Sequence, residues 1–148
     1  MKNFPIILVL VVALQKLLIA QTILKDPFAG IELVLIKGGC FRMGDTFDVG
    51  EQDEFPVHEV CLDDFYIGKY EITQKQWIDI MGYNPSAYPL GDEYPVEWIS
   101  WSDTQRFIQK LNQKTNQQFR LPTEAEWEYA CRARGKHLQY GTNDGTLD

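Results

Sequence analysis

The stretch FRLPTEAEWEYA, residues 119–130, contains the clearest start of a helix in the chain. Thr123 follows Pro122, and Glu126 lies three residues after Thr123, which is the spacing of a capping box at a helix N-terminus. Glu124 and Glu126 fall in the first turn, where the helix dipole favours acidic side chains. Capping therefore accounts for both carboxylates without a catalytic role, and the stretch predicts a helix that begins after Thr123.

The two faces of this helix differ in polarity. Trp127, Ala130 and Cys131 recur at helical spacing and predict a stripe that packs inward. Glu128 and Arg132 are four residues apart on another face, which predicts an exposed ion pair. Solvation and pairing thus explain Glu128 without assigning it to a reaction.

Another helix is expected upstream, where Thr73 and Gln76 have the spacing of a capping box. Gly82 is expected to end this helix. Its predicted inward face consists of Trp77, Ile80 and Met81.

A third helix is expected after a loop at residues 83–95, which is rich in proline and other turn formers. The spacing from Ser102 to Gln105 predicts its capping box. Its predicted buried face consists of Thr104, Phe107, Ile108 and Leu111.

Short strands are expected in the first half of the chain. Four stretches combine β-favouring residues with glycine, proline or aspartate at their ends: residues 31–36, 38–44, 57–62 and 65–72. Strands followed by helices indicate an α+β fold with short elements and much loop.

Composition limits the partners. The chain has 148 residues, of which 45% are hydrophobic, and a formal net charge of −7. This composition is that of one globular domain. Clustered basic residues bind nucleic acids and anionic membranes, so an acidic chain is expected to bind neither without selectivity.

The N-terminus has the features of an export signal. Lys2 precedes an apolar run at residues 6–14, and Lys16 interrupts the apolar sequence before it reaches the ~20 residues of a spanning helix. We expect a signal peptide at residues 1–20, a leader segment at 21–30 and the domain at 31–148, with a periplasmic or extracellular location. An uncleaved N-terminal anchor is the alternative.

Export makes the cysteines informative, because disulfides persist in oxidising compartments. Cys40 and Cys61 lie in neighbouring predicted strands joined by an acidic loop, and we expect them to form a disulfide. Cys131 is then left over, as a buried thiol or as one that pairs outside the chain.

A zinc site built from cysteine and histidine is the competing interpretation. His58 and Cys61 are three residues apart, and Cys131 and His137 are six apart. Structural zinc sites usually contain closely paired cysteines, and the chain has none. The disulfide is therefore favoured, and His58 is expected to be a polar strand residue.

The stretch at residues 119–130 resembles the signature of the formylglycine-generating enzyme family, also called the sulfatase-modifying-factor family. The residues that carry the signature most clearly are Arg120, Leu121, Pro122, Thr123, Glu124, Glu126 and Trp127. Further stretches match the family in the same order: FRMG at 41–44, FPVHEV at 55–60, FYIGKYEIT at 65–73, YPV at 94–96 and ISW at 99–101. The resemblance covers residues 31–141.

The resemblance implies an irregular fold related to C-type lectins, with short strands and about three short helices. It also implies an activity, the oxidation of a sulfatase cysteine to formylglycine with oxygen and Cu(I) held by two thiolates; soft thiolates select this ion. In related sequences the position of Cys131 can pair with a C-terminal cysteine.

The family's copper-binding cysteine pair and calcium ligands lie in its C-terminal part, and no position up to Asp148 matches them. We therefore carry over no catalytic residue, metal ligand or cofactor, and expect an N-terminal portion of the domain that is incomplete at the C-terminus. Such a portion would leave apolar faces such as Trp127 and Ala130 uncovered, which predicts marginal stability or self-association.

Three functions remain open from the sequence. The chain could belong to the exported enzyme family without activity of its own, act as a non-catalytic binding or scaffold module on the same fold, or be a non-functional fragment. A protein substrate or partner protein is the expected class of partner.

Overall fold

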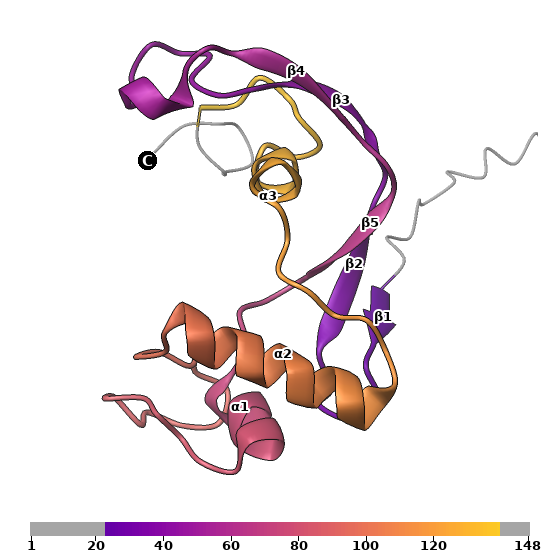
Figure 1. Cartoon of the computed structure of the whole chain (residues 1–148), viewed down its shortest axis with the longest axis vertical. Helices are drawn as coiled ribbons and strands as arrows, with labels where there is room; N and C mark the ends of the chain where they lie inside the picture. Colours follow the sequence, from indigo (N-terminus) through magenta and orange to yellow (C-terminus); the bar gives the residue numbers. More distant parts are fainter. Residues whose placement is uncertain (1–22, 140–148) are drawn as a thin grey trace, which may run out of the picture.

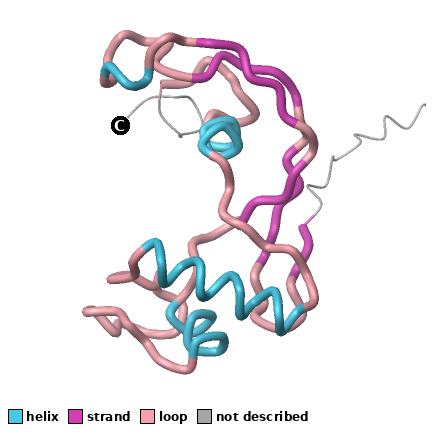
Figure 2. The backbone as a smooth tube through the Cα atoms, viewed as in Figure 1, coloured by secondary structure: helices cyan, strands magenta, loops and turns pink. Residues whose placement is uncertain are grey.

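The computed structural model describes residues 23–139, which form an α+β fold of two small antiparallel sheets and three α-helices (Figures 1 and 2). The strands precede the helices along the chain, as the sequence predicts. The predicted signal peptide at residues 1–20 lies outside the described residues. Within residues 23–139, no helix combines the length and hydrophobicity needed to cross a membrane.

The larger sheet has the strand order β1-β2-β5. Its strands are β1 (Ile23–Lys25), β2 (Glu32–Ile36) and β5 (Phe65–Gly68). Strand β2 pairs antiparallel with both neighbours, and Val34 is opposite Ile23 on one side and Ile67 on the other. No sequence pattern predicts β1, which is short and exposed and lies within the segment expected to be a leader.

The second sheet is a hairpin of β3 (Gly39–Met43) and β4 (His58–Leu62). Strand β3 continues from the end of β2, and β4 leads into β5, so the two sheets form one long curved ribbon (Figure 1). The intervening acidic loop contains a 3-10 helix, η1 (Gln52–Glu54).

The predicted strand at residues 65–72 is too long, because β5 ends at Gly68. The chain turns there to reach the N-terminus of the first helix. Lys69 still donates its backbone N–H to the carbonyl oxygen of Glu32, and Thr73 forms an isolated bridge with Pro95. Residues 69–72, which were predicted to continue the strand, therefore connect β5 to the N-terminus of the first helix.

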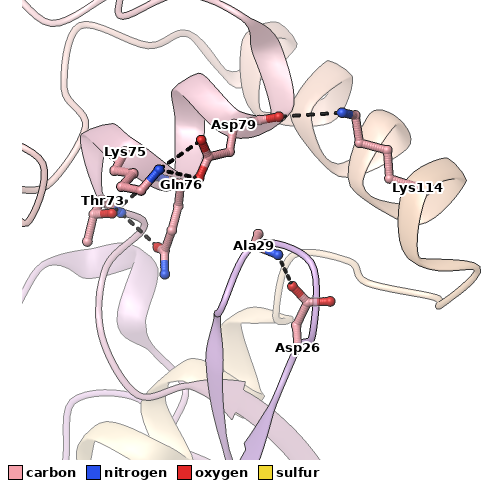
Figure 3. A network of polar contacts seen from close by, with 7 residues as sticks. All are labelled: Asp26, Ala29, Thr73, Lys75, Gln76, Asp79 and Lys114. Atoms are coloured by element: carbon pink, nitrogen blue, oxygen red, sulfur yellow. Dashed lines mark hydrogen bonds and ion pairs between the residues drawn. The ribbon is translucent and has the colours of Figure 1, made fainter.

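Helix α1 (Gln74–Met81) begins and ends as the sequence predicts. The Thr73 side chain accepts the N–H of Gln76, the Gln76 side chain accepts the N–H of Thr73, and Lys75 pairs with Asp79 (Figure 3). Gly82 ends the helix at φ +87°, a left-handed conformation that glycine adopts without strain.

Helix α2 (Trp101–Thr115) begins earlier than expected. Its N-cap is Ser100, whose side chain accepts the N–H of Asp103, so the predicted capping box from Ser102 to Gln105 is wrong. Both serines are followed three residues later by a side chain that can complete a capping box. Ser100 is the one with extended backbone, and Ser102 lies inside the helix.

The main core lies between α1, α2 and the β1–β2 hairpin. Trp77 and Phe107 stack with ring centroids 4.9 Å apart. The buried residues of this cluster are Ala29, Ile31, Trp77, Ile80, Phe107 and Leu111. The faces predicted for the first two helices therefore supply most of the core.

Helix α3 (Glu124–Cys131) packs separately, against β3 of the hairpin (Figure 1). Tyr129 is buried there, with its ring centroid 5.2 Å from that of Phe41, and its hydroxyl donates to the carbonyl oxygen of Lys37. The signature stretch is thereby attached to the strand that contains Cys40.

Candidate functional site

The centre of the signature stretch is a charged pair between Arg120 and Glu126. The two guanidinium Nη atoms of Arg120 donate to the two carboxylate oxygens of Glu126, each at 2.6 Å. Thr123 donates its backbone N–H to the same carboxylate at 2.8 Å and accepts the N–H of Glu126 with its hydroxyl oxygen. Glu126 thus completes the predicted capping box and also binds the segment before the helix.

This environment keeps Glu126 ionised. Although the residue is only 7% exposed, the hydrogen bonds from Arg120 and the N–H of Thr123 lower the pKa of Glu126 to about 2. A general acid or base works best with a pKa near the operating pH, and a carboxylate held this way is poorly matched to that task. The hydrogen bonds of the pair connect the start of α3 with the segment before it.

The other signature residues surround this pair. Leu121 is 39% exposed, and Pro122 and Glu124 are also exposed. Pro122 directly precedes Thr123, the N-cap, which has extended backbone. The segment is therefore the start of a helix that the Arg120–Glu126 pair joins to the preceding chain. We call this pair the clamp.

The predicted inward stripe of α3 is wrong. Trp127 is 59% exposed and Cys131 is exposed, whereas Glu126 and Tyr129 are buried. The physical reason is that the clamp to Arg120 turns the side of the helix that carries Glu126 inward, and Tyr129 lies three residues further along that side. The expectation that Cys131 is a buried thiol is therefore wrong, and pairing outside the chain stays a prediction.

Glu128 and Arg132 form the expected ion pair at 3.1 Å, but the pair is not exposed. Their side chains are 17% and 16% exposed. Glu128 accepts the backbone N–H of Gly44, and Arg132 donates to the carbonyl oxygen of Gly44 at 2.9 Å. The pair binds α3 to the end of β3, which i, i+4 spacing alone cannot reveal.

The predicted disulfide is confirmed. Cys40 and Cys61 face each other in the β3–β4 ladder with their Cα atoms 4.0 Å apart, and their sulfur atoms are bonded. His58 lies on the same hairpin as an exposed strand residue, with Nδ1 2.9 Å from the carbonyl oxygen of Pro56.

The cysteines do not fit a Cu(I) site that needs two thiolates. The chain has three cysteines, two of them are joined in the disulfide, and Cys131 is the remaining thiol. Between residues 23 and 139, no three His, Cys, Asp or Glu side chains come together in a group that could hold a metal ion.

Comparison with known proteins identifies the family. The model of the sulfatase-modifying factor enzyme 1-like domain matches residues 22–148. The chain belongs to the sulfatase-modifying-factor family. The match includes the β1 strand as well as the signature stretch.

Relatives in the sulfatase-modifying-factor family have names that indicate different functions, a chaperone in one case and an enzyme in another. The chaperone protein LppX of Paenibacillus barcinonensis is 34% identical over 78% of this chain and 50% of its own length. The formylglycine-generating enzyme of Mus musculus is 25% identical over 72% of this chain and 41% of its own length. The chain thus spans half or less of these two relatives.

A solved structure supports the fold. PvdO from Pseudomonas aeruginosa aligns with a TM-score of 0.69 and 27% identity over 86% of this chain and 57% of that one. The expected family fold, with short strands and three helices, is thereby confirmed.

Sequence reasoning missed the residues that dock α3 on the hairpin. Tyr129 was not assigned to the buried face, and Arg132 was not expected to bind the backbone at Gly44. A signal for Tyr129 was available, because it lies three residues after Glu126 on the same side of the helix. No local pattern indicates the contact of Arg132.

Proposed function

We propose that this chain is an exported framework part of a sulfatase-modifying-factor domain, without formylglycine-generating activity of its own. The observation that supports the proposal is the state of the cysteines, because the Cys40–Cys61 disulfide leaves one thiol, Cys131. The chemistry that the family resemblance implies needs Cu(I) on two thiolates. One copy of this chain cannot supply such a pair while the disulfide is intact.

The test is turnover of a peptide that contains the cysteine motif of a sulfatase. The purified chain with its disulfide intact is incubated with this peptide, Cu(I) and oxygen, and mass spectrometry follows conversion of cysteine to formylglycine. We expect no product, while a complete formylglycine-generating enzyme run in parallel converts the peptide. Product formation that disappears in Cys131→Ala would contradict the proposal.

Export is part of the proposal and is supported by the disulfide, since such bonds persist in oxidising compartments. We infer that residues 1–20 direct export and that the mature chain begins at Gln21. N-terminal sequencing of the protein from its native compartment should give Gln21 as the first residue. A reduced, full-length chain in the cytoplasm would contradict this inference.

A non-catalytic protein-binding module is the second candidate. It is favoured by the 34% identity to a protein named as a chaperone and by large exposed side chains. Trp98 and Trp101, around the start of α2, are 78% and 70% exposed. Aromatic side chains of this kind are enriched where proteins bind one another.

This candidate predicts that the chain reduces aggregation of an unfolded protein. Light scattering of a heat-denatured model protein should fall when the chain is added in equimolar amount, and the effect should weaken in Trp98→Ala/Trp101→Ala. The matched control is Tyr70→Ala, which removes an exposed aromatic side chain that precedes α1 in the sequence, whereas both tryptophans follow α1. Unchanged scattering with the native chain would rule this function out.

A further inference from the structure

The loop between α1 and α2 and the first turn of α2 present three exposed aromatic side chains, at the other end of the molecule from the β3–β4 hairpin (Figure 1). Trp98 is 78% exposed, Trp101 70% and Tyr88 67%. We call these three residues the aromatic surface. Large aromatic side chains usually bury most of their area, so a group of them on the outside indicates a binding surface.

The three residues of the aromatic surface come from adjoining parts of the chain. The Glu97 carboxylate accepts the backbone N–H of Tyr88 at 2.7 Å. This contact places Tyr88 beside the residue that directly precedes Trp98. Trp101 follows three residues after Trp98, where Ser100 caps α2. One partner can therefore contact the loop and the start of the helix together.

Trp98 has a left-handed backbone, with φ +58°. This conformation is rare for a bulky residue and costs free energy, so it persists only where the surrounding structure enforces it. On one side the N–H of Glu97 donates to the Ser86 hydroxyl, and on the other side Ser100 is the N-cap of α2. Because Trp98 buries little area to offset this cost, its position indicates a role in binding rather than in stability.

The surroundings of the aromatic surface are acidic. Residues 83–105 contain no lysine or arginine but four acidic residues, Asp92, Glu93, Glu97 and Asp103. Asp103 is paired with Arg106, whereas Glu97 forms no ion pair with any residue in the described part of the chain, 23–139. Charge complementarity favours association with partners of opposite sign and disfavours those of like sign, so we expect a basic partner here.

Arginine is the basic side chain that matches both the aromatic and the acidic character of this surface. Its planar guanidinium stacks on aromatic faces and donates paired hydrogen bonds to a carboxylate. Since Trp98 and Trp101 protrude instead of enclosing a cavity, a segment of another protein fits better than a small molecule. We propose that the aromatic surface binds an arginine-containing segment of a partner protein, with guanidinium groups over the tryptophans and an ion pair to Glu97. This inference rests on the protein-binding module given above as the second candidate function, and it names the class of partner.

The test is calorimetric titration of the purified chain with a capped peptide in which arginine alternates with glycine. Lysine in place of arginine keeps the charge without the planar group, and citrulline keeps the planar group without the charge. At low ionic strength we expect saturable binding of the arginine peptide, weaker binding of the lysine peptide and no binding of the citrulline peptide.

Trp98→Asn is the decisive variant, because asparagine adopts a left-handed backbone more readily than tryptophan does. We expect it to weaken binding of the arginine peptide by about tenfold, while its thermal unfolding midpoint stays the same or rises. A tryptophan with a merely structural role would instead lower that midpoint when replaced. Trp127→Ala is the matched control, since it removes another exposed tryptophan from α3, at the hairpin end of the molecule, and should leave binding unchanged.

A second variant tests the contribution of charge. Glu97→Gln keeps an acceptor for the N–H of Tyr88 and removes the negative charge. We expect it to weaken binding of the arginine peptide several-fold and to make that binding less sensitive to salt. Glu59→Gln, at an exposed position on β4, is the matched control and should bind as the native chain does.

Loss of binding in Trp98→Asn with retained stability supports the proposal. The proposal is overturned if the arginine peptide does not bind saturably, if the lysine or citrulline peptide binds equally well, or if Trp98→Asn binds as the native chain does. Should Trp98→Asn fail to fold, Glu97→Gln and the three peptides decide the question.

The light-scattering assay separates this inference from the second candidate function. A native chain that lowers aggregation but does not bind the arginine peptide refutes only the class of partner. A native chain that does neither refutes both the class of partner and the binding module.

Discussion

Glu126 performs two structural tasks with one side chain. It caps α3 through Thr123 and it binds the guanidinium of Arg120 in the segment before the helix. The capping role could be predicted from the sequence, because the spacing of Thr123 and Glu126 is local. The pairing with Arg120 could not, since a guanidinium six residues away reaches Glu126 only when the chain bends at Pro122 and Thr123.

Replacing Glu126 by glutamine should lower the free energy of unfolding by about 2 kcal/mol, because an amide offers one acceptor oxygen to the guanidinium where the carboxylate offers two. Urea denaturation measures the change. Glu124→Gln, at an exposed position in the same turn, is the matched control and should alter stability by less than about 0.5 kcal/mol. Equal effects of the two substitutions would show that the clamp contributes nothing particular.

The same clamp predicts a dependence on pH. The pKa of Glu126 is near 4.5 in the unfolded chain and is lowered to about 2 in the fold, mainly by Arg120. Its stabilisation is therefore complete above about pH 4.5 and is lost as the pH falls toward 2. Stability curves of the native chain and of Glu126→Gln should converge across this interval, and parallel curves would contradict the assignment.

At the scale of elements, the start of α2 shows that only one of two serines with nearly equivalent capping patterns is the N-cap. Ser100 and Ser102 each precede a possible capping partner by three residues, and local pattern alone does not choose between them. In the structure Ser100 is the N-cap with extended backbone, and the helix already includes Ser102. The sequence therefore predicts that α2 exists but does not predict its first residue.

Ser100→Ala should destabilise the protein by about 1 kcal/mol, since it removes the acceptor for the N–H of Asp103. Ser102→Ala, inside the helix, should change stability by less than about 0.5 kcal/mol or increase it slightly. Thermal unfolding of both variants provides the comparison. The reverse order of effects would support the capping box first expected from the sequence.

The β3–β4 hairpin is the element whose pairing was most predictable, because two neighbouring strands and an expected export signal sufficed to predict the bond between Cys40 and Cys61. The double variant Cys40→Ala/Cys61→Ala should lose about 3 kcal/mol of stability, as expected for a closed loop of this length. Chemical denaturation measures the loss, with the exposed Cys131→Ala as a near-neutral control. A double variant as stable as the control would contradict a stabilising disulfide.

At the scale of the whole molecule, the helices are distributed between two places. Helices α1 and α2 enclose the main core, and α3 lies apart against the hairpin (Figure 2). The inward faces of α1 and α2 were predictable because hydrophobic periodicity decides them. The face of α3 was not, since Glu126 binds Arg120 and Glu128 binds the backbone N–H of Gly44, while Trp127 stays 59% exposed.

With the disulfide intact, Cys131 is the remaining thiol, so one copy of the chain offers no pair of thiolates for Cu(I). The most direct measurement is an anaerobic titration of the purified chain, disulfide intact, with Cu(I) in competition with a chromogenic chelator, alongside Cys131→Ala. We predict that the native chain takes no stoichiometric Cu(I) from the chelator and that the two proteins give the same titration curve. One equivalent of Cu(I) held tightly by the native chain and lost in Cys131→Ala would contradict the proposed framework role.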